Sequence, residues 1–395
     1  SDPSIMYLLE NNTLIEQGVT LAHAGIGHGS VFKNNFLFKE WTRPDTILEY
    51  MAFAKKYIFE MEQQYGEAEV SRTLECCRAL QDYSISHKRR SRQKQKNLKK
   101  DFLVEAKIDP PEYSSTVPNF NYDVNMSSQL LKLSNNTYDL PEENILYFLE
   151  KHNKYKDSDM NEVIRICRKL NEYFYPQTKT KILHEGWATF IEYMIFEELY
   201  KKGDIDEGGY LEFFREHCNL VGQSPYSSRF FRSLLSNPYP LGFNIFNDLY
   251  RMTHSPMKED LLEYPEICNT RWQDSLMEIV KNYTDVDLVG RYLTPNVIKS
   301  MNLFSTDFCI EAEYFEISGT SRDIDTIRKV LAAEINRFTW VPRMEITDFY
   351  ANGQELYINL YCTKSVSEES IELFEEYIEF LSGMEVTITE VSIED

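Results

Sequence analysis

Apolar residues recur at helical spacing over most of the first 300 residues, and this pattern constrains the fold more than any other feature of the chain. One stripe follows Pro44 and runs through Ile47, Met51, Ala54 and Met61. The same spacing returns over residues 142–151, 161–174 and 180–200. Two aromatic-rich segments follow at 209–221 and 242–252, joined through NPYPLG, whose two prolines predict a turn that presents Tyr239. Such stripes bury one face of a helix against its neighbours. The sequence therefore predicts a body of packed, antiparallel helices.

The pattern changes near Cys309, where apolar and polar residues begin to alternate as they do in strands. From there we expect a strand over 309–318, a helix over 322–337, two strands flanking a turn at Asn352-Gly353, a helix over 368–381 and a strand over 384–391. This order is the βαββαβ pattern of small ferredoxin-like domains. The predicted fold class is α+β, with a large mainly α-helical domain over residues 1–305 and a small ferredoxin-like domain over residues 306–395.

Charge and cysteine content exclude several classes of protein. A net charge of −21 repels nucleic acid and anionic membranes, so nucleic-acid binding is not expected. The seven cysteines are scattered without a CxxC pair, as in reduced cytosolic proteins. No stretch approaches the roughly 18 uncharged apolar residues of a membrane helix, and the first residues show no export signal. We therefore expect a cytoplasmic globular protein without a membrane anchor.

Two polar stretches separate the helical segments. Residues 88–100, KRRSRQKQKNLKK, form a basic run that predicts a solvated helix or mobile arm, with contact to an acidic partner or RNA as the alternative. Residues 106–141 contain four prolines amid serine and asparagine, which predicts a long surface connection.

Histidine is scarce, with seven in the chain, so His23, His28 and His184 stand out in the segments LAHAGIGHGS and LHEGWATF. His23 and His28 are five residues apart, which places them about 140° from each other on a regular α-helix. Three glycines interrupt this stretch, and a π-bulge or a helix end there would bring the two imidazoles together. The segment therefore permits a metal-binding pair.

Glu185 supplies the carboxylate that such a pair lacks. Two imidazoles, one carboxylate and an open water position form a familiar catalytic zinc arrangement, which predicts a divalent metal, most simply Zn²⁺, on His23, His28 and Glu185. His184 points about 100° away from Glu185 and is an alternative ligand or a residue that orients Glu185 or substrate. Glu192 lies two helical turns after Glu185 on the same face and is the candidate proton acceptor.

Other interpretations stay open, because a metal-free polar or catalytic pocket and a purely structural hydrogen-bonded core also fit these residues. A metalloprotease of the HExxH kind keeps a glutamate where this chain has Ala24, so any hydrolytic base must come from elsewhere. Tyr239, between two prolines, is a candidate donor to an oxyanion or a packed tyrosine. Asn34 and Asp248 are candidates to line the site, with caps and buried hydrogen bonds as the alternative.

Five segments carry a resemblance to a known family: PSIMYLLENN, LAHAGIGHGSVFKNNFLFKEWT, LPEENILYFLEKH, EYFYPQTKTKILHEGWATFIEYMI and SNPYPLGFNIFNDLYR. Spanning residues 3 to about 252, they resemble the SpoVR family, the stage V sporulation protein R and its relatives. The resemblance implies a link to spore cortex or coat formation or to stress response, with a PrkA-type serine kinase and a von Willebrand A-like protein as partners. Family members often have asparagine where this chain has His184, which favours Glu185 over His184 as ligand.

Two hypotheses on function follow. An EGWA segment after a histidine pair also resembles metallopeptidases whose third zinc ligand is that glutamate. The first hypothesis is therefore a divalent-metal hydrolase acting on an amide in a peptide or cell-wall fragment. The second is a non-enzymatic regulatory or scaffold protein that partners the PrkA-type kinase system.

Overall fold

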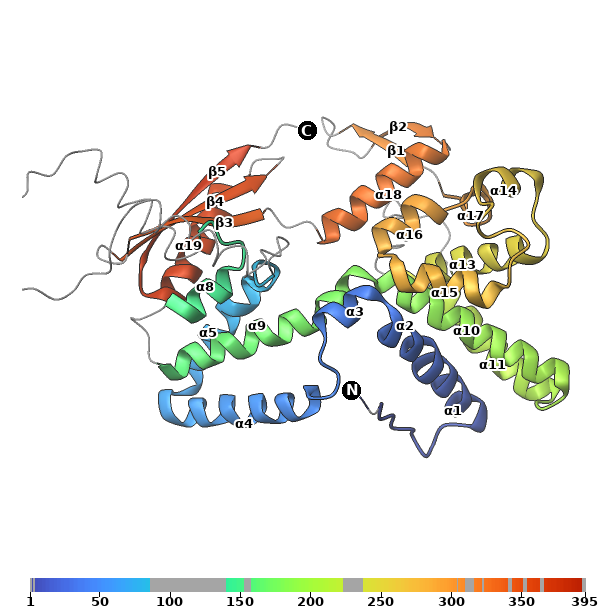
Figure 1. Cartoon of the computed structure of the whole chain (residues 1–395), viewed down its shortest axis with the longest axis horizontal. Coiled ribbons are helices and arrows are strands. Elements are labelled where there is room, and N and C mark those ends of the chain that lie inside the picture. Colours follow the sequence, from blue (N-terminus) through green and yellow to red (C-terminus); the bar gives the residue numbers. More distant parts are fainter. Residues whose placement is uncertain are drawn as a thin grey trace, which may run out of the picture. The chain divides into compact units, whose positions relative to one another are not determined.

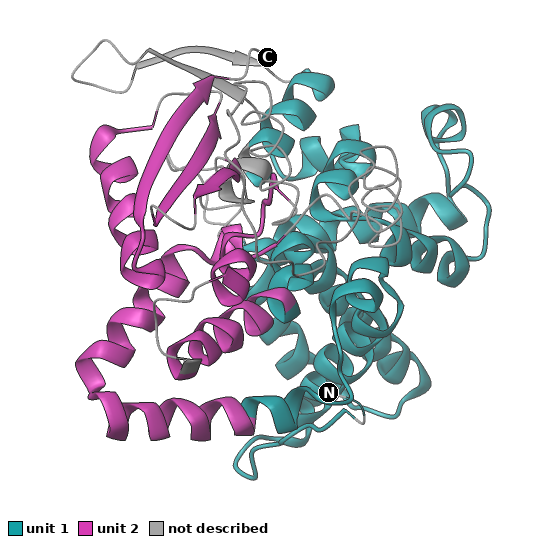
Figure 2. Ribbon diagram, turned by 60° about the vertical axis from the view of Figure 1, so that its left-hand side comes forward, with its two compact units in different colours: residues 1–51, 173–341 teal, residues 52–172, 342–395 magenta. Residues whose placement is uncertain are grey.

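The structure is a computed structural model, and it describes residues 2, 4–85, 140–152, 158–222, 237–303, 305–309, 316–321, 323–339, 343–350, 354–362 and 366–392. The basic run at 88–100 and residues 106–139 of the predicted surface connection lie outside these ranges. The chain divides into two compact units (Figure 2). Unit 1 comprises Ser1–Met51 and Tyr173–Val341, and unit 2 comprises Ala52–Glu172 and Pro342–Asp395.

Helices build most of unit 1, as the periodicity predicts (Figure 1). They are α1 (Leu14–Thr20), η1 (Leu21–His28), α2 (Gly29–Asn34), α3 (Phe36–Trp41), α10 (Lys181–Lys202), α11 (Glu207–Val221), α13 (Pro238–His254), α14 (Lys258–Glu263), α15 (Trp272–Asn282), α16 (Asp285–Tyr292), α17 (Pro295–Ser300) and α18 (Ile324–Thr339). Two further helices, α4 (Ile47–Tyr65) and α9 (Ser158–Lys179), contribute residues to both units. None of the helices described combines the length and apolar character needed to cross a bilayer.

Helix α10 is the centre of unit 1, because it is buried on nearly all sides of its axis. It packs against η1, α11, α13, α15 and α16. Trp187 and Phe190 of α10 join Phe246 of α13 in an aromatic cluster with ring centroids 5.2 to 6.3 Å apart. Polar side chains on so buried a helix need partners inside the protein. This requirement applies to His184 and Glu192, both buried on α10.

Glycines let two other helices approach α10 closely. A Cβ added to Gly186 would lie 2.3 Å from the Cα of Gly242 on α13. A Cβ added to Gly27 of η1 would lie 2.5 Å from the Cα of Ala188. Both distances are shorter than packed carbon atoms allow. The two helix crossings at their observed spacing therefore require glycine.

The first turn of α10 is anchored by a residue from another helix. Thr180, at the N-cap, makes no side-chain capping hydrogen bond. Instead the carboxylate of Asp285 on α16 accepts hydrogen bonds from the backbone N–H groups of Ile182 at 3.0 Å and Leu183 at 2.8 Å. Helix N-termini leave these donors free, and a carboxylate there also complements the helix dipole. The start of α10, just before Glu185, is thereby fixed.

Unit 2 combines helices with a three-stranded sheet. Besides its parts of α4 and α9, it contains α5 (Glu67–Ala79), η2 (Gln81–Tyr83), α8 (Ile145–His152), β3 (Arg343–Tyr350), β4 (Glu355–Cys362), α19 (Glu368–Ser382) and β5 (Glu385–Ser392). Strands β3 and β4 are antiparallel, and β5 lies parallel to β4 after the α19 crossover. In β4 the buried residues alternate through Leu356, Ile358 and Leu360, as the period of two predicts.

The predicted α+β class is confirmed, with a mainly helical body and a small C-terminal α/β part, but the strand order differs from the ferredoxin-like pattern. Of the single strand predicted over 309–318, residues 310–315 lie outside the described residues. Its two described ends belong to different strands, β1 (Ser305–Cys309) and β2 (Glu316–Ser321), which pair antiparallel with each other, so the single strand is wrong. The described strands of the larger sheet have the order β3-β4-β5. The division into compact units does not address which segments fold independently. The predicted domain boundary between residues 305 and 306 therefore stays a prediction.

The NPYPLG segment does not form the predicted turn. Helix α13 begins at Pro238, and Tyr239 and Pro240 lie in its first turn. Proline is tolerated there because the first N–H groups of a helix have no intrahelical acceptor. Tyr239 is therefore presented by a helix N-terminus.

Replacing Gly186 by alanine tests the α10–α13 crossing. We expect Gly186→Ala to lower the free energy of unfolding by about 1–3 kcal/mol, because the added methyl forces the two backbones apart. Gly290→Ala is the matched control, since no heavy atom lies within 4 Å of a Cβ added on α16. Alanine in a helix interior is favoured over glycine by roughly 0.5–1 kcal/mol. Urea unfolding measures both variants, and equal stabilities would contradict the requirement for glycine at the crossing.

Candidate metal centre

The segment that carries His23 and His28 forms a π-helix. Helix η1 continues α1 and leads into α2, so residues 14–34 make one helical run with wide turns in its middle. Each hydrogen bond of a π-helix spans five residues, which brings side chains five apart onto a similar face. The two imidazoles accordingly meet edge to face, with ring centroids 4.8 Å apart. Of the two predicted routes to this pairing, the π-bulge is the one that forms.

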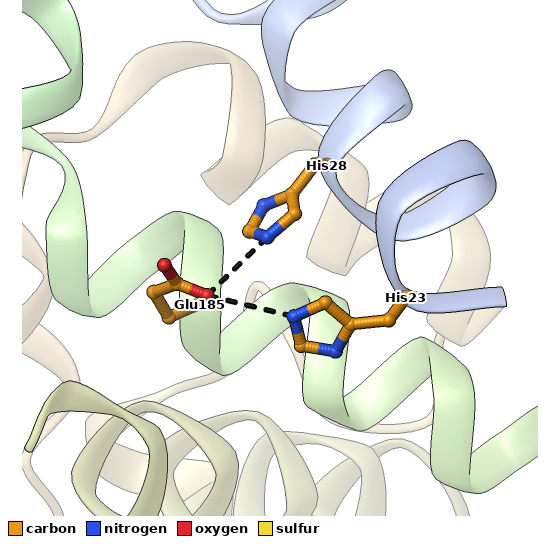
Figure 3. Close-up of side chains that lie close together, drawn as sticks. All are labelled: His23, His28 and Glu185. Atoms are coloured by element: carbon orange, nitrogen blue, oxygen red, sulfur yellow. Dashed lines mark ion pairs between the residues drawn. The ribbon is translucent and has the colours of Figure 1, made fainter. Parts of the chain in front are cut away.

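Glu185 faces this pair from α10, with its carboxylate directed between the two rings (Figure 3). Its Oε2 lies 3.3 Å from His28 Nε2 and 3.5 Å from His23 Nε2. One ligand atom from each residue lies within 4.8 Å of the other two. Ligands about 2.1 Å from a tetrahedral zinc ion are about 3.4 Å from one another. The spacing of the three side chains therefore fits one small cation.

The hydrogen bonding of Glu185 also fits a cation. Its Oε2 is buried, yet it makes no aligned hydrogen bond to a described residue, although two imidazole nitrogens are close. A buried polar atom without a hydrogen bond lowers the stability of the fold by about 1–3 kcal/mol. A cation between the three side chains would satisfy this oxygen. Two imidazoles and one carboxylate suit a divalent cation such as Zn²⁺.

The histidines and carboxylates of the cluster shift one another's pKa values, each favouring the charged form of the other. Burial alone would lower the pKa of His23, but the close carboxylates of Glu185 and Glu192 outweigh it and raise that pKa to about 9. Burial would raise the pKa of Glu185, but contact with three histidines holds it well below its usual range. At neutral pH a cation must therefore displace a proton from His23.

His184 lies beside Glu185, with its Nε2 3.5 Å from Glu185 Oε1. Burial lowers the pKa of His184, so the ring is neutral at pH 7. The Thr180 hydroxyl donates its proton to the carbonyl of Pro176 at 2.7 Å. Its 3.3 Å contact with His184 Nδ1 therefore requires the ring proton on Nδ1. In this tautomer Nε2 carries no proton, so it and Glu185 Oε1 are two acceptors 3.5 Å apart, a pair that a bound proton or cation would stabilise.

Glu192 and Tyr239 contact the cluster at different atoms. Glu192 accepts a 2.9 Å hydrogen bond from His23 Nδ1, the ring nitrogen that does not face Glu185. The ring of Tyr239 lies 6.1 Å from that of His23 between centroids. Burial and the nearby carboxylate of Glu185 raise the pKa of Tyr239 to about 12, so its hydroxyl keeps its proton at neutral pH. The catalytic roles of both residues stay predictions.

The other two sequence candidates make their contacts elsewhere. Asn34 donates to the carbonyl of Ser30 within α2. Asp248 on α13 accepts hydrogen bonds from three side chains: Arg251, Thr294 and Asn296. None of these partners belongs to the histidine cluster. The structure therefore does not bring Asn34 or Asp248 to the cluster through any described hydrogen bond.

Two neighbours of the cluster are absent from the sequence-based prediction. His217 of α11 is buried, and its Nδ1 lies 3.8 Å from Glu192 Oε1. No motif surrounds His217, and its position depends on how α11 packs against α10. Phe32 stacks on His28, with ring centroids 5.5 Å apart and planes 8° from parallel. The four-residue helical spacing between these two residues was a signal for that contact.

Comparison with known proteins places these residues in a family. The family model described as SpoVR like protein matches residues 1–340. The chain belongs to the SpoVR family. It is 35% identical over 359 residues to the Escherichia coli (strain K12) protein named Uncharacterized protein YcgB. The aligned residues make up 89% of this chain and 69% of that protein. No solved structure matches the chain significantly.

The SpoVR match covers every residue of the histidine cluster and ends before β3. It confirms the family predicted from the motifs. The links to sporulation and stress response stay predictions. So do the partnership with a PrkA-type kinase and a von Willebrand A-like protein, the binding of zinc and the cytoplasmic location.

The raised pKa of His23 predicts a pH dependence of stability in protein stripped of metal by a chelator. The folded pKa of about 9 exceeds the unfolded value of 6.5, so the native state binds the proton more tightly. This stabilisation, on the order of 3 kcal/mol, is fully present below about pH 6.5 and is lost as the pH rises through about 9.

Calorimetric melting temperatures between pH 6 and pH 10 check this prediction. We expect the melting temperature of wild type to fall more steeply across this range than that of His23→Gln, which keeps a hydrogen-bonding side chain without the titration. Parallel pH profiles for the two proteins would contradict the assignment.

Proposed function

We propose that this SpoVR-family chain is a divalent-metal hydrolase that cleaves an amide bond in a peptide or a cell-wall fragment. The convergence of His23, His28 and Glu185 supports the proposal, since three ligand-type side chains from two helices meet around a buried carboxylate oxygen without an aligned hydrogen bond. Catalytic zinc sites commonly use three protein ligands of this kind and leave a fourth position for water or substrate.

Residues beside the proposed ligands supply the other groups that hydrolysis needs. When bound, a divalent cation polarises a carbonyl and lowers the pKa of a water molecule. His184 Nε2 carries no proton in the neutral ring and is placed beside Glu185 to accept one. The Tyr239 hydroxyl keeps its proton and is placed near Glu185 to donate a hydrogen bond to an oxyanion.

The proposal moves the proton-accepting role from Glu192 to His184. Glu192 is 2% exposed, and its Oε2 is already hydrogen-bonded to His23 Nδ1. The proposed ligand atom of His23 is the other nitrogen, Nε2, which faces Glu185. Glu192 therefore lies behind His23 with respect to the reacting side. His184 instead faces the second carboxylate oxygen of Glu185.

Metal content tests the proposed ligands directly. We expect wild type, loaded with Zn²⁺ and passed through a desalting column, to retain about one ion per chain. Glu185→Gln and His28→Asn remove one ligand each and should leave the protein without stoichiometric zinc. His254→Asn is the control, because His254 is an exposed histidine on α13 whose hydrogen bonds to described residues all lie within its own helix. Elemental analysis that finds equal zinc in all four proteins would refute the site.

Amide hydrolysis by the zinc-loaded protein tests the reaction. A panel of fluorogenic peptide amides and cell-wall peptide fragments reports release of the amine. We expect Tyr239→Phe to retain its zinc while kcat falls by about 10²-fold, the usual cost of removing one oxyanion donor. Full activity in Tyr239→Phe would contradict its role. No amine release by zinc-loaded wild type from any member of the panel would favour the regulatory alternative.

A further inference from the structure

Two buried ionisable residues lie behind His23, on the side away from Glu185. Glu192 of α10 is 2% exposed and His217 of α11 is 3% exposed. Burial of a carboxylate costs several kcal/mol unless partners compensate for the lost water. The partners of Glu192 are His23 Nδ1 at 2.9 Å and His217 Nδ1 at 3.8 Å. Each carboxylate oxygen thus faces a different imidazole.

The contact with Glu192 determines which nitrogen of His23 faces the proposed metal. His23 bridges two carboxylates of α10, with Nδ1 at Glu192 and Nε2 at Glu185. A neutral imidazole carries a single proton, and the hydrogen bond to Glu192 places that proton on Nδ1. The lone pair is then on Nε2, on the Glu185 side. A carboxylate on the outer nitrogen of a histidine ligand commonly fixes its tautomer and its ring orientation.

His217 faces the other oxygen of Glu192 from a closely packed position. Its ring is packed among Tyr193, Phe213 and Phe243, with centroid distances of 5.2, 5.6 and 4.8 Å. Its Nδ1 is buried and has no aligned hydrogen bond to a described residue, so the Glu192 carboxylate is the charge that it faces. A ring immobilised in this way restrains Glu192 from turning away from His23.

We propose that Glu192 and His217 are positioning residues of the metal centre. Glu192 fixes the tautomer and the orientation of His23, and His217 fixes Glu192. The inference rests on the proposed metal site and extends it to α11, a helix that supplies no ligand.

Zinc affinity of the full chain, measured by competition with a chromophoric chelator, tests the pair. We expect Glu192→Gln to weaken zinc binding by about 10- to 100-fold and His217→Phe by about 10-fold. The double variant should bind zinc no more weakly than Glu192→Gln alone, because both changes act through the same contact with His23. Val70→Ala is the control for lost packing, since Val70 is fully buried in a hydrophobic cluster of unit 2 and its change should lower stability without changing zinc affinity.

Failure of this inference can be told apart from failure of the metal site. If wild type binds zinc and His217→Phe binds it equally well, the role of His217 is refuted while the three ligands stand. Fully additive losses in the double variant would also overturn the proposed pair, since they would show that the two residues act independently.

A second measurement does not depend on zinc. Long-range ¹⁵N–¹H NMR of the chelator-treated chain at about pH 10, above the pKa of His23, reports which ring nitrogen carries the proton. We expect the Nδ1–H form in wild type and an increased share of the Nε2–H form in Glu192→Leu. An Nε2–H ring in wild type would refute the positioning role whether or not zinc binds.

Discussion

Close backbone contact at two glycines determines where the proposed ligands lie. Gly27 immediately precedes His28, and Gly186 immediately follows Glu185. Each glycine touches a neighbouring helix where a methyl group has no room. A shift of about 1 Å is enough to spoil a catalytic or metal-binding geometry, so the packing of η1 and α13 against α10 also aligns the two ligands. The core and the site thus depend on the same contacts.

The two carboxylates that α10 directs toward His23 differ in what remains for them to bind. Glu192 is hydrogen-bonded to Nδ1 of that ring, whereas Glu185 Oε2 lies near Nε2 without an aligned hydrogen bond. Two helical turns separate the carboxylates, and the imidazole lies between them. One carboxylate is consequently used in holding the ring, and the other is left to face a ligand. The helical spacing predicted their shared face but not this difference.

Features set by local sequence were the ones that could be predicted. The helices follow from apolar spacing, and the pairing of His23 with His28 follows from glycines within the same ten residues. Contacts that depend on distant packing were missed. His217 reaches the cluster only because α11 packs on α10. The residues around Cys309 alternate like one strand, but their backbone pairs within a hairpin, and a local pattern does not specify the hydrogen-bond partner.

The wide turn of η1 also explains why the proposed base lies on another helix. In an HExxH helix the two histidines are four residues apart, and the glutamate after the first one faces the metal-bound side. Here the two histidines are five residues apart, one more than in HExxH, and Ala24 follows His23. The proposed proton acceptor lies instead on the facing helix, where His184 precedes Glu185 on α10.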